Sequence, residues 1–170
     1  MAALILSLAA LSGLQRVLRA EVLARTPHLE VVLPAEADWP SQRQRLEAHP
    51  EVVRAQTVLE GLGWLVSERG LVHPVAVTGF EGTVPAAFPG AAGEPEGLYV
   101  DHLLRASWDL EVGDFLEVVS PRPTLSPFGG PQPRLRSLAL AGVFEKPRTQ
   151  EDRSRIAVPL GLAESLFGRA

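Results

Sequence analysis

Few side chains in this 170-residue sequence have the chemistry for catalysis or metal binding, and they are spread along the chain. The four histidines lie in different segments at long spacing, which is typical of surface or turn histidines. A metal site that assembles them in space is the alternative. The histidines are His28, His49, His73 and His102. Because the chain also has no cysteine, a disulfide framework and thiolate metal sites are excluded. We assign no residue as a metal ligand.

A Ser/His/Asp combination occurs once, in a short stretch that contains Asp101, His102, Ser107 and Asp109. Combinations of this kind are common by chance. Asp114 is expected to shape a turn ahead of a strand rather than to act as a base. The sequence contains no G-x-x-x-x-G-K-[ST], no G-x-G-x-x-G, no H-E-x-x-H and no G-x-S-x-G motif. We therefore predict a protein that is not an enzyme and needs no cofactor.

The net charge of −4 argues against nucleic-acid binding, which requires a basic face. Hydrophobic residues make up 46% of the chain, enough to fill a core, so the composition is that of a folded domain. The 15 prolines and 15 glycines predict many turns. Composition therefore favours a globular, turn-rich domain and leaves the function open.

The segment from Leu125 to Pro133 has the composition of a binding loop, with three prolines, two glycines and a phenylalanine. Proline and glycine disfavour regular strand pairing, so we expect a rigid loop that projects Phe128. An exposed aromatic side chain on a rigid loop is ordered at low cost and suits a partner contact. Arg134 and Arg136 follow on one face of the expected strand, because successive side chains alternate. The alternative is that Phe128 folds back onto the domain.

The elements that must position this loop alternate between strand and helix patterns. Strands are predicted by β-branched and apolar runs at 28–33, 51–59, 63–67, 71–80, 115–119, 135–144 and 156–158. A short polar helix is predicted at 41–48 by start and stop signals at Trp39-Pro40-Ser41 and His49-Pro50, and further helices are predicted at 98–107 and 160–167. A loop is expected over 81–96. We expect an α+β fold of mostly antiparallel strands with short helices on one side, from which a long hairpin, 120–136, projects.

The N-terminal segment predicts a helix that leaves a membrane. Residues 1–14 carry no charge, but a full span needs about 20 apolar residues. The 3.6-residue pattern continues as an amphipathic helix that ends near Thr26 and Pro27, since proline cannot continue it. We interpret 1–26 as the end of a transmembrane helix and a membrane-proximal helix, and 27–170 as an extracytoplasmic domain. An atypical signal peptide is the alternative.

Several stretches, taken in order, carry a resemblance to a known family. The apolar helix passes into LSGLQRVLRAEVLARTPHLEVV, and the stretches HPEVVRA and VAVTGF follow. The strongest block begins with GLYV, continues through LEVGD, Ser120-Pro121 and LAGVF, and closes on AVPL before a final helix. Over nearly its whole length the chain resembles the first membrane-helix end and the periplasmic domain of lipoprotein-releasing ABC permeases of the LolC/LolE type. MacB-like and FtsX-like permeases are related to these.

The resemblance implies a subunit of a machine that extracts lipoproteins from the inner membrane. The implied partners are a separate ABC ATPase subunit, a second permease subunit, identical or paralogous, lipoprotein cargo and a LolA-like periplasmic chaperone. Implied sites are a hook tip at Ser126, Pro127, Phe128 and Gly129, and a pad to which Arg134 and Arg136 belong. The sequence departs from the family where Phe128 replaces an aliphatic or Met side chain, and the tip is about one residue longer. The implied location is the inner membrane, with the main domain facing the periplasm.

Other functions remain open from the sequence. A MacB-like efflux permease shares the domain but generally lacks the hook, and a secreted binding module would account for the N-terminus as a signal peptide. A hydrolase that uses Asp101 or His102 has no motif to support it.

Overall fold

The computed structural model describes residues 2–25, 28–34, 37–82, 88, 97–125, 129–145 and 154–168. The chain divides into two compact units, Met1–Val32 and Leu33–Ala170. The first contains one helix, α1 (Ala2–Arg25), which follows the predicted apolar and amphipathic run. Among the described residues, no helix combines the length and the apolar character needed to cross a membrane. The membrane-helix end therefore stays a prediction.

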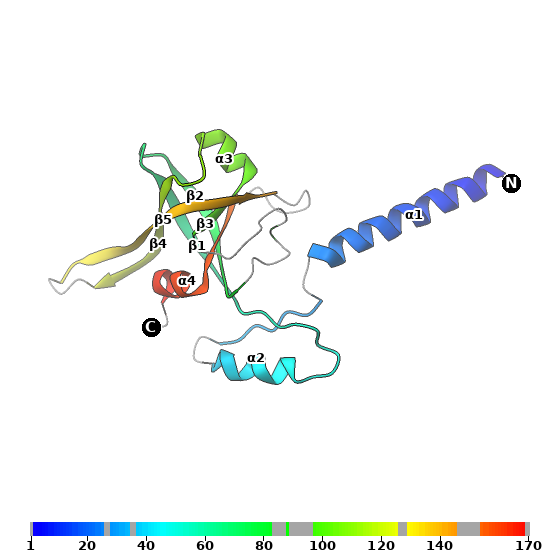
Figure 1. Ribbon diagram of the computed structural model, residues 1–170, viewed down its shortest axis with the longest axis horizontal. Helices are drawn as coiled ribbons and strands as arrows, with labels where there is room; N and C mark the ends of the chain where they lie inside the picture. Colours follow the sequence, from blue (N-terminus) through cyan, green and yellow to red (C-terminus); the bar gives the residue numbers. More distant parts are fainter. Residues whose placement is uncertain are drawn as a thin grey trace. The chain divides into compact units, whose positions relative to one another are not determined.

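The second unit is built on a closed six-stranded barrel, with strand order β1-β2-β6-β3-β5-β4 (Figure 1). The strands are β1 (Val58–Ser67), β2 (Val72–Phe80), β3 (Leu98–Asp101), β4 (Phe115–Leu125), β5 (Pro131–Phe144) and β6 (Ser154–Pro159). Four neighbouring pairs are antiparallel, whereas β2 with β6 and β3 with β5 are parallel. The predicted α+β fold with mostly antiparallel strands is confirmed.

The barrel interior is filled by apolar side chains that alternate along the strands. Leu65, Val77, Val118 and Ile156 are fully buried in this cluster, to which every strand contributes. Alternation then places the neighbours of these residues on the outer surface of the barrel. The interior is therefore a packed core.

A second, aromatic cluster lies on the outside of the barrel. Tyr99 and Ala157 alternate with interior residues of β3 and β6, and they pack with Phe80 and Phe144. The ring of Phe88 covers them and meets the Phe144 ring edge to face, with centroids 4.7 Å apart. Phe88 belongs to the segment that was expected to be a loop, so this segment contributes to the packing of the domain.

The described residues of this unit form the helices α2 (Trp39–Glu47), α3 (His102–Trp108) and α4 (Leu160–Phe167). Helices α3 and α4 lie at opposite ends of the barrel (Figure 1). Trp108 of α3 contacts His73 at the start of β2, whereas Ala163 of α4 lies against Gly79 near its end. The expectation that the helices share one side is wrong. Because β3 and β6 run antiparallel, the helix that follows each strand begins at the opposite rim.

Two of the strand predictions were wrong. Residues 28–33 form no strand and are exposed, because the β-branched pattern there has no partner strand to pair with. The predicted strand pair over 51–67 is one continuous strand, β1, and 51–57 precede it without pairing. Gly61 lies inside β1, where a Cβ atom would come within 2.6 Å of the Phe167 ring. That glycine therefore serves the close approach of α4 and marks no turn.

The helix predicted over 98–107 is a strand followed by a helix. Leu98–Asp101 form β3 between β5 and β6, and α3 begins only at His102. Asp101 caps α3, because its Oδ1 accepts a hydrogen bond from the Leu104 amide at 2.8 Å. The apolar residues before Asp101 fit the periodicity of a helix and that of a strand equally well. They form a strand because they are buried between two neighbouring strands.

Candidate functional site

The candidate site is the hairpin formed by β4 and β5, which projects from the barrel (Figure 1). Strand β4 pairs with β1 only from Leu116 to Val119, and β5 pairs with β3 only from Leu140 onward. The outer part of the hairpin, which we call the stem, comprises 120–125 and 131–136. Each strand of the stem has a single partner, the other strand. The two paired strands of the hairpin predicted at 120–136 are therefore present, and in the described part of the chain no further strand pairs with either outer edge of the stem.

The stem pairs more regularly than its prolines predicted. Antiparallel pairing continues to Leu125 opposite Pro131, with one irregularity between Ser120 and Pro123. Proline lacks an amide donor and is tolerated on strands whose outer edges are unpaired. The expectation that proline and glycine exclude pairing here is therefore wrong for the stem, because its free edges need no donors.

A two-residue bulge marks the base of the stem. Ser120 pairs with Arg134 and Pro123 with Pro133, so Pro121 and Arg122 lie opposite no residue of β5. The amide of Arg122 donates to the Ser120 hydroxyl oxygen at 3.2 Å, which satisfies the donor that the bulge leaves unpaired. Bulges of this kind redirect side chains. Here the bulge brings Arg122 to α4.

Two arginines of the stem attach it to the end of α4. Nη1 of Arg122 donates to the Phe167 carbonyl at 3.1 Å. The guanidinium of Arg134 packs so closely on Gly168 that a Cβ atom there would collide with it. The last carbonyls of a helix lack intrahelical partners and carry partial negative charge, so cations are favourable at this end. The base of the hairpin is therefore fixed against α4.

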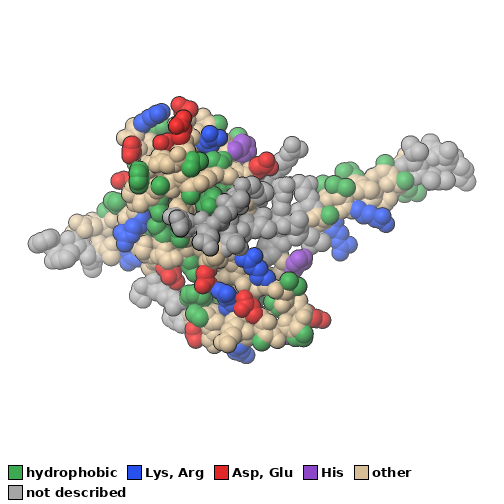
Figure 2. Space-filling model, in the orientation of Figure 1, with side chains coloured by type: hydrophobic (Ala, Val, Ile, Leu, Met, Phe, Trp, Pro, Cys, Tyr) green, Lys and Arg blue, Asp and Glu red, His purple; other side chains and the backbone are tan. Residues whose placement is uncertain are grey.

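An open recess of about 460 Å³ lies along this face of the stem. Its lining comes from both stem strands and from α4: Thr124, Gln132, Pro133, Arg134, Leu135, Arg136 and Ser165. Arg136 is exposed, and its Nη1 donates only locally, to the Leu135 carbonyl at 3.1 Å. Within the described part of the chain, no carboxylate forms an ion pair with Arg134 or Arg136. Basic side chains are visible at the base of the hairpin in Figure 2.

The structure describes some of the predicted site residues and not others. Ser126, Pro127 and Phe128 lie outside the described residues. Gly129 has φ +87°, a conformation that favours glycine. Arg134 and Arg136 both line the recess. Sequence reasoning missed Arg122, because its partner is a carbonyl 45 positions further along the chain.

Three residues of the possible triad, Asp101, Ser107 and Asp109, have structural roles. Ser107 donates to the Leu104 carbonyl at 3.0 Å, and Asp109 ends α3 in the left-handed conformation. Oδ2 of the buried Asp101 has no partner among the described residues. As predicted, Asp114 shapes a turn, since its carboxylate accepts from the Glu111 amide at 2.9 Å.

Among the histidines, His73 has contacts that link several elements of the barrel unit. His73 contacts the Ser154 hydroxyl at 3.0 Å and lies edge-on to Trp108, so it joins β2, β6 and α3. No cluster of three or more His, Cys, Asp or Glu side chains that would hold a metal ion occurs among the described residues. The His73 and Ser154 pair borders neither the stem recess nor a smaller recess of about 260 Å³ beside Phe115. We assign this pair a structural role.

Two comparisons with known proteins were informative only in being negative. No protein-family model matches the chain, and no curated protein matches it significantly. The resemblance to lipoprotein-releasing permeases therefore rests on the ordered sequence stretches.

Proposed function

We propose that this chain is the periplasmic domain of an ABC permease of the lipoprotein-releasing type, and that its hairpin docks a LolA-like chaperone. The observation that carries the proposal is the stem, which extends beyond the barrel sheet and presents Arg134 and Arg136 without carboxylate partners among the residues that the structure describes. The stem stands in the region where the family resemblance expects the hook and pad. A separate ATPase, a second permease subunit and lipoprotein cargo complete the proposed machine in the inner membrane.

The construction of the hairpin supports a docking role. Its base is fixed to α4 by Arg122 and Arg134, so the stem is supported at its base. Arms that are ordered before binding lose less entropy in a complex. Arginine and aromatic side chains are also the residue types that most often dominate binding energy. The hairpin favours this function over that of a MacB-like efflux permease, in which a hook is generally absent.

The proposal is tested by titrating the purified chain with the LolA-like chaperone encoded in the same genome. We expect Phe128→Asp and Arg136→Glu each to weaken binding by about tenfold or more, because each removes a contact of the type that dominates interfaces.

The matched controls are Val112→Asp, at an exposed apolar residue of another turn, and Arg69→Glu, at an exposed arginine between β1 and β2. Both controls are expected to bind like the wild type. If Phe128→Asp leaves the affinity unchanged, the assignment of the hook is wrong.

A further inference from the structure

Helix α2 is attached to the barrel differently from α3 and α4. Those two helices contribute Leu104 and Leu166 to the interior cluster. None of the nine residues of α2, all of which the structure describes, is buried. Among the described residues, neither apolar cluster includes a side chain from 37–57. The core of the barrel is therefore complete without α2.

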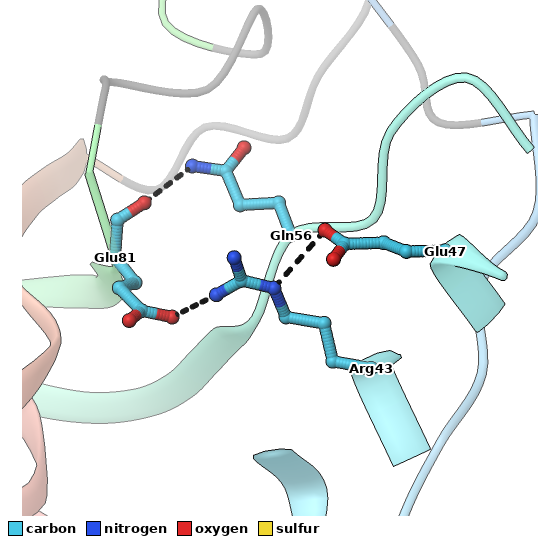
Figure 3. A network of polar contacts seen from close by, with 4 residues as sticks. All are labelled: Arg43, Glu47, Gln56 and Glu81. Carbon is cyan, nitrogen blue, oxygen red and sulfur yellow. Dashed lines mark hydrogen bonds and ion pairs between the residues drawn. The ribbon is translucent and has the colours of Figure 1, made fainter. Parts of the chain in front are cut away.

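Polar contacts centred on Arg43 join α2 to the barrel (Figure 3). Nε of Arg43 donates to Oε1 of Glu47, one turn further along α2, at 3.2 Å. Its Nη1 pairs with the carboxylate of Glu81, which directly follows β2. Gln56, between α2 and β1, donates to the carbonyl of Glu81 at 3.1 Å. Glu81 is thus the point on the barrel that receives both contacts.

These contacts are of the kind that salt weakens. The side chains of Arg43, Glu47 and Glu81 are each more than one-third exposed, so water and ions screen their charges. The hydrogen bond and charge of Glu47, together with the charge of Glu81, raise the pKa of Arg43 above its ordinary value. Arg43 therefore stays protonated, and the strength of the attachment varies with ionic strength.

Once detached, α2 is not stable as a helix. It has nine residues, and its N-cap residue, Asp38, makes no side-chain capping bond. Isolated helices shorter than about 12–15 residues are marginal in water. Release from the barrel and melting of α2 are therefore coupled, and the exposed contacts of Arg43 contribute to both.

We propose that α2 is a releasable strap, with Arg43 and Glu81 as its latch. When the latch opens, the chain from Ala37 to Thr57 becomes a flexible tether ahead of β1, while the barrel stays folded. The inference concerns a conformational switch in this unit and is independent of the proposed chaperone docking.

Hydrogen–deuterium exchange of the full chain tests the strap. In Arg43→Ala and in Glu81→Gln, we expect peptides of α2 to exchange about three- to fivefold faster, with barrel peptides unchanged. About 0.5 M NaCl should accelerate the exchange of α2 peptides in the wild type to a similar extent. In Glu81→Gln, the same salt should accelerate this exchange little further. The double variant should resemble either single variant, because both substitutions break one contact.

Two controls separate the latch from general effects on α2. Arg45→Ala removes the same charge from the same helix without touching Glu81, and Glu47→Gln removes only the contact within α2. Both should leave the exchange of α2 close to that of the wild type. The proposal is overturned if Arg43→Ala does not accelerate exchange, if Arg45→Ala accelerates it equally, or if α2 and barrel peptides accelerate together.

Discussion

Strands β4 and β5 have two distinct parts, one inside the barrel and one beyond it. From Phe115 to Val119, β4 lies beside β5, with β1 along most of its other edge, and Leu116 and Val118 point into the core. Beyond Ser120, the two strands pair only with each other and most of their described side chains are exposed. One hairpin thus serves first as barrel wall and then as a projecting arm.

The sequence changes character where the structure does. The wall part of β4 reads FLEVV, with apolar residues alternating inward, whereas the stem continues as SPRPTL. On β5 the order is reversed, from PQPRLR in the stem to LALAGVF in the wall. The wall is selected for packing, whereas the stem carries the residues that suit binding. Substitutions in the two parts are therefore expected to affect different properties.

The largest expected difference compares Leu140 with Leu135, five positions apart on β5. Leu140 is 1% exposed in the core, whereas Leu135 is 45% exposed on the stem. Leu140→Ala is expected to lower the free energy of unfolding by about 2–5 kcal/mol, because it leaves a cavity. Leu135→Ala is expected to change it by less than about 0.5 kcal/mol. Urea denaturation measures both values, and equal losses would contradict the division into wall and stem.

A smaller difference separates two arginines of the hairpin. Arg122→Ala removes the hydrogen bond to the Phe167 carbonyl and is expected to cost roughly 0.5–1 kcal/mol of unfolding free energy. Arg136→Ala should leave stability unchanged, since among the described residues Arg136 donates only to the carbonyl of its own neighbour, Leu135. It should instead weaken chaperone binding. Thermal unfolding and a binding titration on the same two proteins check this. The proposed roles of the two arginines are contradicted if Arg122→Ala weakens chaperone binding and Arg136→Ala lowers the free energy of unfolding.

Local patterns predicted the elements whose partners lie nearby in the sequence. The periodicity over 160–167 matches α4, and the run 71–80 matches β2 within one residue. The β4–β5 hairpin was predictable because its strands are adjacent along the chain. Closure of the barrel was not, because it depends on pairs such as β3 with β6, whose contacts join distant segments. Leu98 to Asp101 were misassigned for the same reason.

The candidate site was predictable to a similar extent. The i, i+2 spacing of Arg134 and Arg136 and the proline-rich composition identified the stem from sequence. The bulge at Pro121 and Arg122, which turns Arg122 toward α4, depends on the register with β5 and on the position of the last helix. Neither is encoded in the local sequence. The latch between Arg43 and Glu81 joins residues 38 positions apart and has no local pattern either.

Deletion of the outer part of the hairpin, residues 121–133, tests most directly the central claim that this hairpin docks the chaperone. Replacing 121–133 by Asn-Gly joins Ser120 to Arg134, which already pair, through a two-residue turn suited to a hairpin. The barrel pairing of β4 with β1 and of β5 with β3 is left intact. We predict a shortened protein that unfolds cooperatively but no longer binds the LolA-like chaperone. Binding at wild-type affinity by this folded variant would contradict the account.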